Sequence, residues 1–325
     1  MALELDKKNG QILSIQHLQV EYQTSEETVK AVNDVNFDLN YGETIGLVGE
    51  TGAGKTTIAK AIMGILPEST ARVKHGQIIL EGMDVLKLNN KEMSLLRGKK
   101  VSMVFQDPMT ALNPVMRVGD QIADGIRRHE KCSKAEARKK AVAIFEMVGI
   151  PGERFTEYPH QFSGGMKQRV VIAIALACNP DLLIADEPTT ALDVTIQAEV
   201  LDMIKRLQQE KQTAMILITH DFGVVAQTCD RVAVVYAGEI IEYGTVRQVF
   251  EAPTHPYTIG LFNAIPQLET ETDRLIPIAG SPADPTDLPE GCYFSPRCPY
   301  ASEACRKGHV ALKDLGDGHQ CRCVR

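Results

Sequence analysis

The phosphate-binding pattern G-x-x-x-x-G-K-[ST] is complete at residues 49–56, where the chain reads GETGAGKT. An apolar run at residues 44–48 indicates a buried strand before the loop, and residues 56–66 are typical of a helix that ends before Pro67. A chance match in a Gly-rich turn is the alternative, and the flanking strand and helix disfavour it. The order of strand, glycine loop and helix therefore predicts an α/β domain with a phosphate site.

Each residue type in the loop has a physical reason to be there. Glycines allow the tight turn in which consecutive backbone N–H groups point at phosphate oxygens, and the helix N-terminus adds partial positive charge. Lys55 is expected to reach the β- and γ-phosphates, and the Thr56 hydroxyl to hold Mg²⁺. The expected ATP-binding residues of the loop are Gly49, Glu50, Thr51, Gly52, Ala53, Gly54, Lys55, Thr56 and Thr57.

The 325-residue length allows one large α/β domain with an appendage, or two domains. A net charge of −7 argues against nucleic acid as the main partner. A basic run between residues 127 and 140 is interleaved with acidic residues, which favours a solvated helix face over a nucleic-acid patch. The sequence shows no apolar run near 18 residues and no signal peptide, so we expect a cytosolic protein.

The first strands are expected at residues 12–22 and 29–39, as an antiparallel pair. Tyr22 ends the first of them and could stack on a nucleotide base, although surface packing is the ordinary role of such a tyrosine. Further strands are expected at residues 76–80 and 101–105. A helix should open at the capping box formed by Ser133 and Glu136.

Three later apolar strands end in polar residues suited to phosphoryl transfer: Gln106, the pair Asp186-Glu187, and His220. Ligands of a parallel α/β sheet bind at the carboxyl ends of its strands. Asp186 is expected to hold Mg²⁺ together with Thr56. Glu187 is placed to orient and deprotonate the attacking water. The sequence therefore predicts an ATP-hydrolysing site.

The chain from Lys55 to Asp186 is longer than one crossover helix requires, which predicts an inserted helical subdomain at about residues 107–165. The insertion ends at the segment FSGGMKQR, residues 162–169, a second Gly-rich helix start suited to phosphate. One nucleotide could hardly contact both helix starts of a single chain. We therefore expect two chains to meet head to tail, each completing the other's site.

In order and spacing, these motifs resemble the nucleotide-binding subunit of an ABC transporter over about residues 11–250. The resemblance implies a RecA-like sheet with an antiparallel β subdomain and an inserted helical subdomain. It implies that Tyr22 stacks on adenine, that Gln106 senses the γ-phosphate, contributes to the Mg²⁺ site and couples to membrane subunits, and that His220 contacts the γ-phosphate. The residues that it assigns to the partner's ATP and to the dimer contact are Ser163, Gly164, Gly165 and Gln168, and Asp193.

Several segments narrow the resemblance to the first ATPase subunit of dipeptide/oligopeptide importers. They are FQDPMTALNP, ITHDFGVVAQ, VVYAGEI, PTHPYT and GCYFSPRCP. This family implies ATP hydrolysis that powers peptide uptake at the cytoplasmic face of the cell membrane, with permease subunits, a second like or unlike ATPase chain, and an external peptide-binding protein. Four alternatives stay open: a motor for nickel or another small solute, a non-transport ABC ATPase, a metal- or redox-sensing module, and an exporter.

The composition changes at Glu251, which divides an ATPase domain at residues 1–250 from a C-terminal extension at residues 251–325. Nine of the sixteen prolines lie between Pro253 and Pro299, so the extension should have little regular structure.

The extension also holds five cysteines, enough thiolates for a metal cluster or a tetrahedral metal site. Resemblance to the importer family implies a [4Fe-4S] cluster, while zinc and free thiols remain alternatives. The implied ligands are Cys292, Cys298, Cys305 and Cys323, with Cys321 as an alternate fourth.

Overall fold

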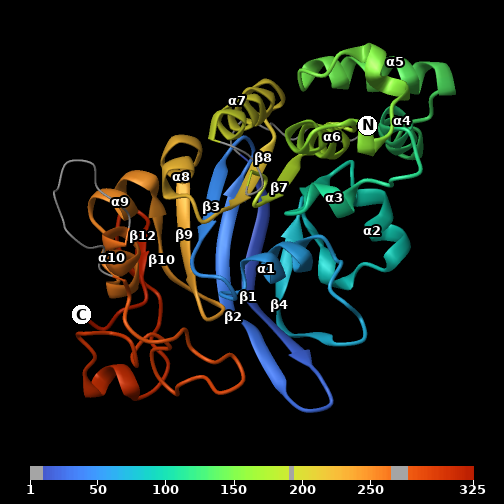
Figure 1. Cartoon of the computed structure of the whole chain (residues 1–325). Coiled ribbons are helices and arrows are strands. Elements are labelled where there is room, and N and C mark those ends of the chain that lie inside the picture. Colours follow the sequence, from blue (N-terminus) through green and yellow to red (C-terminus); the bar gives the residue numbers. More distant parts are fainter. Residues whose placement is uncertain (1–9, 190–193, 265–276) are drawn as a thin grey trace. The chain divides into compact units, whose positions relative to one another are not determined.

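The structure is a computed structural model that describes residues 10–189, 194–264 and 277–325 (Figure 1). The chain forms two compact units. Unit 1 contains the chain up to Leu13, Leu39–Thr44 and Leu80–Ile218, and unit 2 contains Ser14–Asp38, Ile45–Ile79 and Thr219–Arg325. Across the described ranges, no helix has both the length and the apolar character needed to cross a membrane.

An antiparallel hairpin opens the fold and contributes to unit 2. Strands β1 (Gln11–Gln23) and β2 (Thr28–Asn40) are neighbours joined by a short turn, and β4 (Ala71–Leu80) lies on the other side of β1. Buried positions alternate at Leu18 and Val20 of β1 and at Val35, Phe37 and Leu39 of β2, while residues 12–15 of β1 are all buried. The expected antiparallel pair is confirmed, and β4 begins earlier than its apolar end suggested.

The second sheet of unit 2 brings distant parts of the chain together. Strand β3 (Thr44–Val48) pairs in parallel with β9 (Arg231–Tyr236), and β10 (Glu239–Thr245) runs antiparallel to β9. The C-terminal strands β12 (His319–Cys321) and β11 (Lys313–Gly316) continue the sheet beyond β10. The helices of this unit are α1 (Lys55–Ile62), α8 (Phe222–Thr228), α9 (Val246–Glu251) and α10 (Pro256–Asn263), with the 3₁₀ turn η4 (Glu303–Arg306).

The described part of the C-terminal extension is largely irregular, in keeping with its proline content, and its regular elements are α10, η4, β11 and β12. Strand β12 supplies the backbone partners that the edge of β10 would otherwise lack. Tyr257 of α10 and Phe294 are buried in one aromatic cluster with Tyr236 of β9. The extension therefore shares the apolar core of unit 2 instead of wrapping around it.

Unit 1 is built on three parallel strands in the order β8 (Ala214–Ile218), β7 (Leu182–Asp186) and β6 (Val101–Val104). All three are buried along their length, as expected for a parallel sheet covered on both faces. Its other elements are β5 (Met83–Asp84), η1 (Val85–Lys87), α2 (Asn90–Leu96), α3 (Pro108–Ala111), α4 (Val118–His129), α5 (Lys134–Met147), η2 (Gly152–Thr156), η3 (Pro159–Gln161), α6 (Gly164–Leu176) and α7 (Val194–Lys211).

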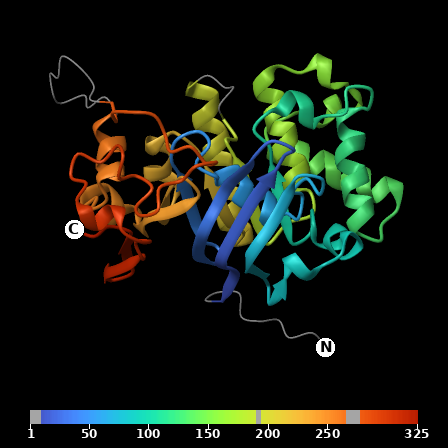
Figure 2. The ribbon, with the colours of Figure 1, turned by 90° about the horizontal axis from the view of Figure 1, so that it is seen from below.

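Helices α4, α5 and α6 pack together around one apolar cluster, seen as the green group in Figure 2. Phe145 of α5 meets Phe155 edge to face, with ring centroids 6.3 Å apart. The expected capping box begins α5, because Ser133 and Glu136 exchange side-chain and backbone hydrogen bonds. The position of this bundle agrees with a helical insertion between β6 and β7, while the exact domain boundaries stay a prediction.

Candidate nucleotide site

The phosphate loop joins β3 to α1 and has glycine where no other residue fits. Gly49 and Gly54 have φ angles of 149° and 104°, in the region that side chains rarely adopt. A Cβ at Gly49 would lie 2.1 Å from the Val235 carbonyl oxygen, and one at Gly54 would lie 2.4 Å from that of Ala31. Helix α1 begins directly after Gly54 without a side-chain cap. Its first N–H groups therefore suit an anion.

Lys55 and Tyr22 both lie against this loop. Lys55 is 5% exposed, and its Nζ donates to the carbonyl oxygens of Gly49 at 2.7 Å and Glu50 at 2.9 Å. The Tyr22 hydroxyl lies 3.2 Å from the Thr57 Oγ1 on α1. The fold therefore brings the tyrosine at the end of β1 to the start of the loop helix, although the two are distant in sequence.

The carboxyl ends of β6 and β7 meet in unit 1. Asp186 is buried as the last residue of β7, and Glu187 follows it with a left-handed φ of 47°. The Glu187 N–H donates to the Ile218 oxygen at 2.8 Å, while Gln106 Nε2 donates to Glu187 Oε2 at 2.6 Å. A left-handed non-glycine residue is strained, and such strain concentrates at functional sites. Gln106 and Glu187 are thus brought together as expected.

His220 is exposed in unit 2, next to Asp221, whose side chain caps α8. It follows the last residue of β8 by two positions, as the sequence pattern predicts.

The signature segment, residues 162–169, opens α6. Ser163 is the N-cap, its Oγ accepts from Met166 N at 3.4 Å, and it is exposed together with Gly164. Gln168 differs from this exposed pair: it is 2% exposed, and its amide donates to the Pro188 oxygen beside Glu187. The expected dimer-contact residue Asp193 lies outside the described residues.

The prediction of an iron-sulfur cluster is wrong. In residues 10–189, 194–264 and 277–325, no three His, Cys, Asp or Glu side chains are grouped so that they could hold a metal ion, which also removes the zinc alternative. All eight cysteines are free. The four proposed ligands line a space of about 20 Å³, close to what one water molecule needs. Burial raises the pKa of Cys292 to about 11, so this thiol stays protonated and packs as a small apolar group.

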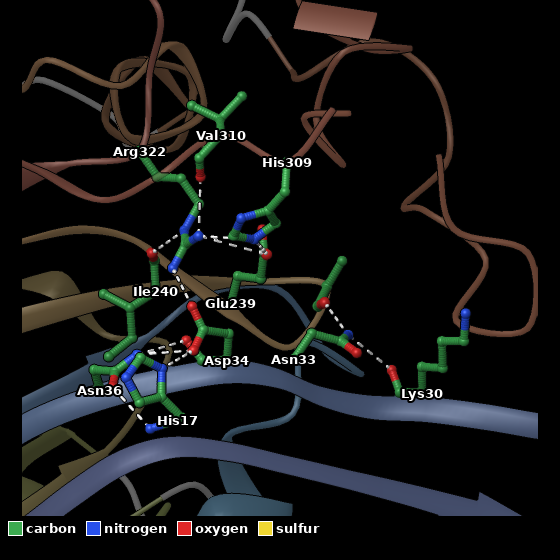
Figure 3. A network of polar contacts seen from close by, with 11 residues as sticks. His17, Lys30, Asn33, Asp34, Asn36, Glu239, Ile240, His309, Val310 and Arg322 are labelled. Carbon is green, nitrogen blue, oxygen red and sulfur yellow. Dashed lines mark hydrogen bonds and ion pairs between the residues drawn. The ribbon is translucent and has the colours of Figure 1, made fainter. Parts of the chain in front are cut away.

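Two polar clusters attach the end of the chain to the strands of unit 2. In the first, shown in Figure 3, Arg322 lies 3.6 Å from Asp34 and 3.7 Å from Glu239, and His309 Nε2 lies 2.7 Å from Glu239. Burial raises the pKa of Glu239 although Arg322 is nearby.

In the second cluster, Glu242 of β10 accepts from the backbone N–H of Thr254 and His255 and from His319.

Sequence reasoning missed two residues that contact the phosphate loop. The Arg297 guanidinium forms an ion pair with the Glu50 carboxylate, and the Tyr257 hydroxyl accepts from the Glu50 N–H. Both residues lie in segments that the sequence had marked, PTHPYT and GCYFSPRCP, but no local pattern gave them a role.

The glycine loop, the strand-end carboxylates and the second Gly-rich helix start define a class, and comparisons agree with it. The model of the ABC transporter family matches residues 32–190. Among solved structures, the chain is similar to the dimeric post-hydrolysis state of the ATP-binding cassette MJ0796 bound to ADP and Pi, with a TM-score of 0.66 and 26% sequence identity. The match covers 73% of this chain and 99% of that chain. This protein is an ABC-type ATPase, and the expected fold class is confirmed.

The family within this class follows from longer matches. A model described as the oligopeptide/dipeptide transporter C-terminal region matches residues 241–305. The dipeptide transport ATP-binding protein DppD of Bacillus subtilis is 50% identical over 96% of this chain and 94% of its own length. The oligopeptide transport ATP-binding protein OppD of Salmonella typhimurium is 50% identical, with 97% and 93% covered. The chain belongs to this family of dipeptide and oligopeptide transport ATP-binding proteins.

Proposed function

We propose that this chain hydrolyses ATP to power the import of dipeptides or oligopeptides through partner permease subunits. The names of its relatives support the transported class, since they describe dipeptide and oligopeptide transport. The observation that carries the hydrolytic role is the 2.6 Å contact between Gln106 and Glu187 at the ends of two parallel strands.

In this proposal Glu187 accepts a proton from the attacking water. The Gln106 amide fixes the direction of the carboxylate and responds to the γ-phosphate. Glu187 is well placed for this task because its backbone is anchored to β8 through Ile218. His220 stabilises the γ-phosphate from the segment after β8.

The phosphate loop binds the nucleotide through backbone N–H groups and Lys55, and Tyr22 stacks on adenine. A Cβ at Gly54 would clash with the Ala31 carbonyl oxygen, so the turn that directs the loop N–H groups at a phosphate requires glycine there. The hydroxyl of Thr56, the amide oxygen of Gln106 and the carboxylate of Asp186 are the hard oxygen donors that Mg²⁺ prefers. The ion, when bound, neutralises charge on the phosphates.

A second ATPase chain completes each site. Ser163, Gly164 and Gly165 face the partner's ATP, and the exposure of Ser163 and Gly164 at the start of α6 supports this role. Gln168 is proposed to connect α6 to the segment after Glu187 through its bond to Pro188. We propose that Asp193 lies at the dimer contact, that the pair docks on the cytoplasmic face of the membrane, and that an external protein delivers the peptide.

The test replaces Glu187 with Gln in the purified chain. ATP binding should persist while hydrolysis falls by about 100-fold or more, because the base is lost and the shape is kept. Glu210→Gln, at an exposed position of α7, is the matched control and should hydrolyse ATP normally. Unchanged hydrolysis in the Glu187→Gln variant would remove that residue from its role.

Transport is tested in cells that depend on this chain, by measuring uptake of labelled dipeptide, labelled oligopeptide and nickel. Peptide uptake should disappear in the Glu187→Gln strain and persist in the Glu210→Gln strain. If the Glu187→Gln strain lost nickel uptake but kept normal peptide uptake, that result would contradict the proposed substrate class.

A further inference from the structure

An acidic side chain lies inside the phosphate loop and is paired with the opposite end of the chain. Glu50 is the second residue of the loop, and Arg297 contacts it with two nitrogens: Nη1 lies 2.7 Å from one carboxylate oxygen and Nη2 lies 3.1 Å from the other. This is the two-point geometry in which arginine binds carboxylates most strongly. The contact spans 247 residues of sequence.

The pairing matters because the loop must bind a polyphosphate. A carboxylate in the same loop repels phosphate oxygens, and it does so strongly at short range in a partly desolvated site. The Arg297 side chain is only 5% exposed, so solvent screens its interaction with Glu50 weakly. Its hydrogen bond to Glu50 raises the pKa of Arg297 further, which keeps the guanidinium charged. Arg297 thus compensates the negative charge that Glu50 brings to the loop.

Arg297 is itself held in place by the extension and by β9. Its Nε donates to the Ala279 oxygen at 3.0 Å, and its guanidinium lies 5.9 Å from the ring centroids of both Tyr236 and Phe294. A charged group fixed by its own backbone contact and two aromatic faces has little freedom to leave Glu50. The guanidinium can therefore impose a position on the loop carboxylate.

Tyr257 of α10 holds the backbone of the same residue. Its hydroxyl accepts from the Glu50 N–H at 2.9 Å, and the side chain is fully buried. Its ring packs at 4.7 Å from Tyr236 and 5.4 Å from Phe294, measured between centroids. Both the side chain and the backbone N–H of Glu50 are therefore bound by residues of the C-terminal extension.

We propose that Arg297 and Tyr257 are positioning residues for ATP: they hold Glu50 so that the phosphate loop keeps its binding shape and its negative charge is neutralised. The inference rests on the proposed function of this loop in ATP binding. It assigns the C-terminal extension a direct part in nucleotide affinity.

The experiment measures the Kd for Mg-ATP, the KM and the kcat of the purified full chain carrying Arg297→Gln, and the same for Tyr257→Phe. Arg297→Gln should raise the Kd and KM for ATP by about tenfold, which corresponds to about 1.4 kcal/mol, with a smaller change in kcat. The Kd and KM of Arg297→Lys should fall between those of the unchanged chain and those of Arg297→Gln, because lysine keeps the charge and loses the two-point geometry. Tyr257→Phe keeps the ring and should raise KM by roughly threefold through the loss of one hydrogen bond.

Arg322→Gln is the matched control. Arg322 is 4% exposed, belongs to the same extension, and faces Asp34 and Glu239 instead of the phosphate loop. It should lower thermal stability and leave the KM for ATP unchanged. An equal rise of KM in the Arg322→Gln and Arg297→Gln variants would mean that any damage to the extension weakens binding, and would overturn the proposal.

A rescue separates positioning from folding. If the unpaired Glu50 carboxylate causes the loss, the double variant Glu50→Gln with Arg297→Gln should bind ATP several-fold more tightly than Arg297→Gln alone. Failure of this rescue, or an unchanged KM in Arg297→Gln, overturns the inference. Lys55→Ala tests the proposed function separately: ATP binding that survives this change would move the nucleotide away from the loop altogether.

Discussion

Glu242 offers a quantitative test of how the C-terminal extension is attached. The side chain is 0% exposed, and three donors converge on it. Thr254 N and His319 Nε2 donate to Oε1 at 2.7 and 2.9 Å, and His255 N donates to Oε2 at 2.9 Å. Replacement by glutamine keeps the shape and exchanges one acceptor oxygen for an N–H₂ group.

The magnitude follows from these contacts. With its oxygen in the Oε1 position, the glutamine satisfies Thr254 and His319 but leaves the buried His255 N–H without an acceptor, at a cost of about 1–3 kcal/mol. The two retained bonds lose their charge, which removes about 1 kcal/mol more. We expect a total near 3 kcal/mol, or about 150-fold in an opening equilibrium.

Hydrogen exchange measured by mass spectrometry on a peptide covering residues 252–264 is the assay, because it reports local opening without assuming that the whole chain unfolds in one step. Glu242→Gln should speed exchange of the Thr254 and His255 amides by about 100-fold. Glu251→Gln, which removes an exposed pair with Arg247, should change exchange by less than about threefold. Acceleration below about threefold in the Glu242 variant would refute the buried-network account.

Two further predictions concern the loop and pH. Without nucleotide, Gly52→Ala should lower the free energy of unfolding by about 1–2 kcal/mol through its left-handed backbone alone. Gly54→Ala should lower it by at least twice as much, because its Cβ would lie 2.4 Å from the Ala31 oxygen. Equal urea midpoints for the two variants would contradict this prediction. Burial lowers the pKa of His255 to about 3. Between pH 6.5 and pH 4 only the unfolded chain therefore gains this proton, and stability should fall by about 1.4 kcal/mol per pH unit. His255→Asn keeps a helix cap, and its unfolding free energy, measured by urea titration at each pH, should fall less steeply between pH 6.5 and pH 4. The same pH dependence in both proteins would show that His255 does not cause this loss of stability.

The strands and the phosphate loop could be predicted because their signals are local. The apolar run before Gly49 predicts β3 directly, and the contact between Gln106 and Glu187 follows from the rule that parallel strands present their carboxyl ends together. The inward position of Gln168 was also readable, since Val171, Ile172 and Ala175 share its helix face at spacings of three, four and seven.

The contacts of the extension could not be predicted in the same way. Arg297 meets Glu50 across most of the chain, and no periodicity in a Pro-rich segment indicates which residue it faces. The cysteines show the converse error. Their spacing and the family resemblance suggested ligands, but spacing does not fix where thiols point, and apolar residues such as Phe294 and Val310 line the same small space. Long-range packing decides both cases.

The pairing of β12 with β10 has a consequence for synthesis on the ribosome. A sheet in which β10 pairs with residues 319–321 cannot be completed until nearly the whole chain has emerged. The phosphate loop leaves the ribosome early, yet its partner Arg297 follows 247 residues later. A translation rate of about 5–20 residues per second gives a delay of roughly 12–50 seconds. During that interval the Glu50 carboxylate of the nascent loop has no Arg297 to pair with. A chain truncated before the extension should therefore bind nucleotide with lower affinity.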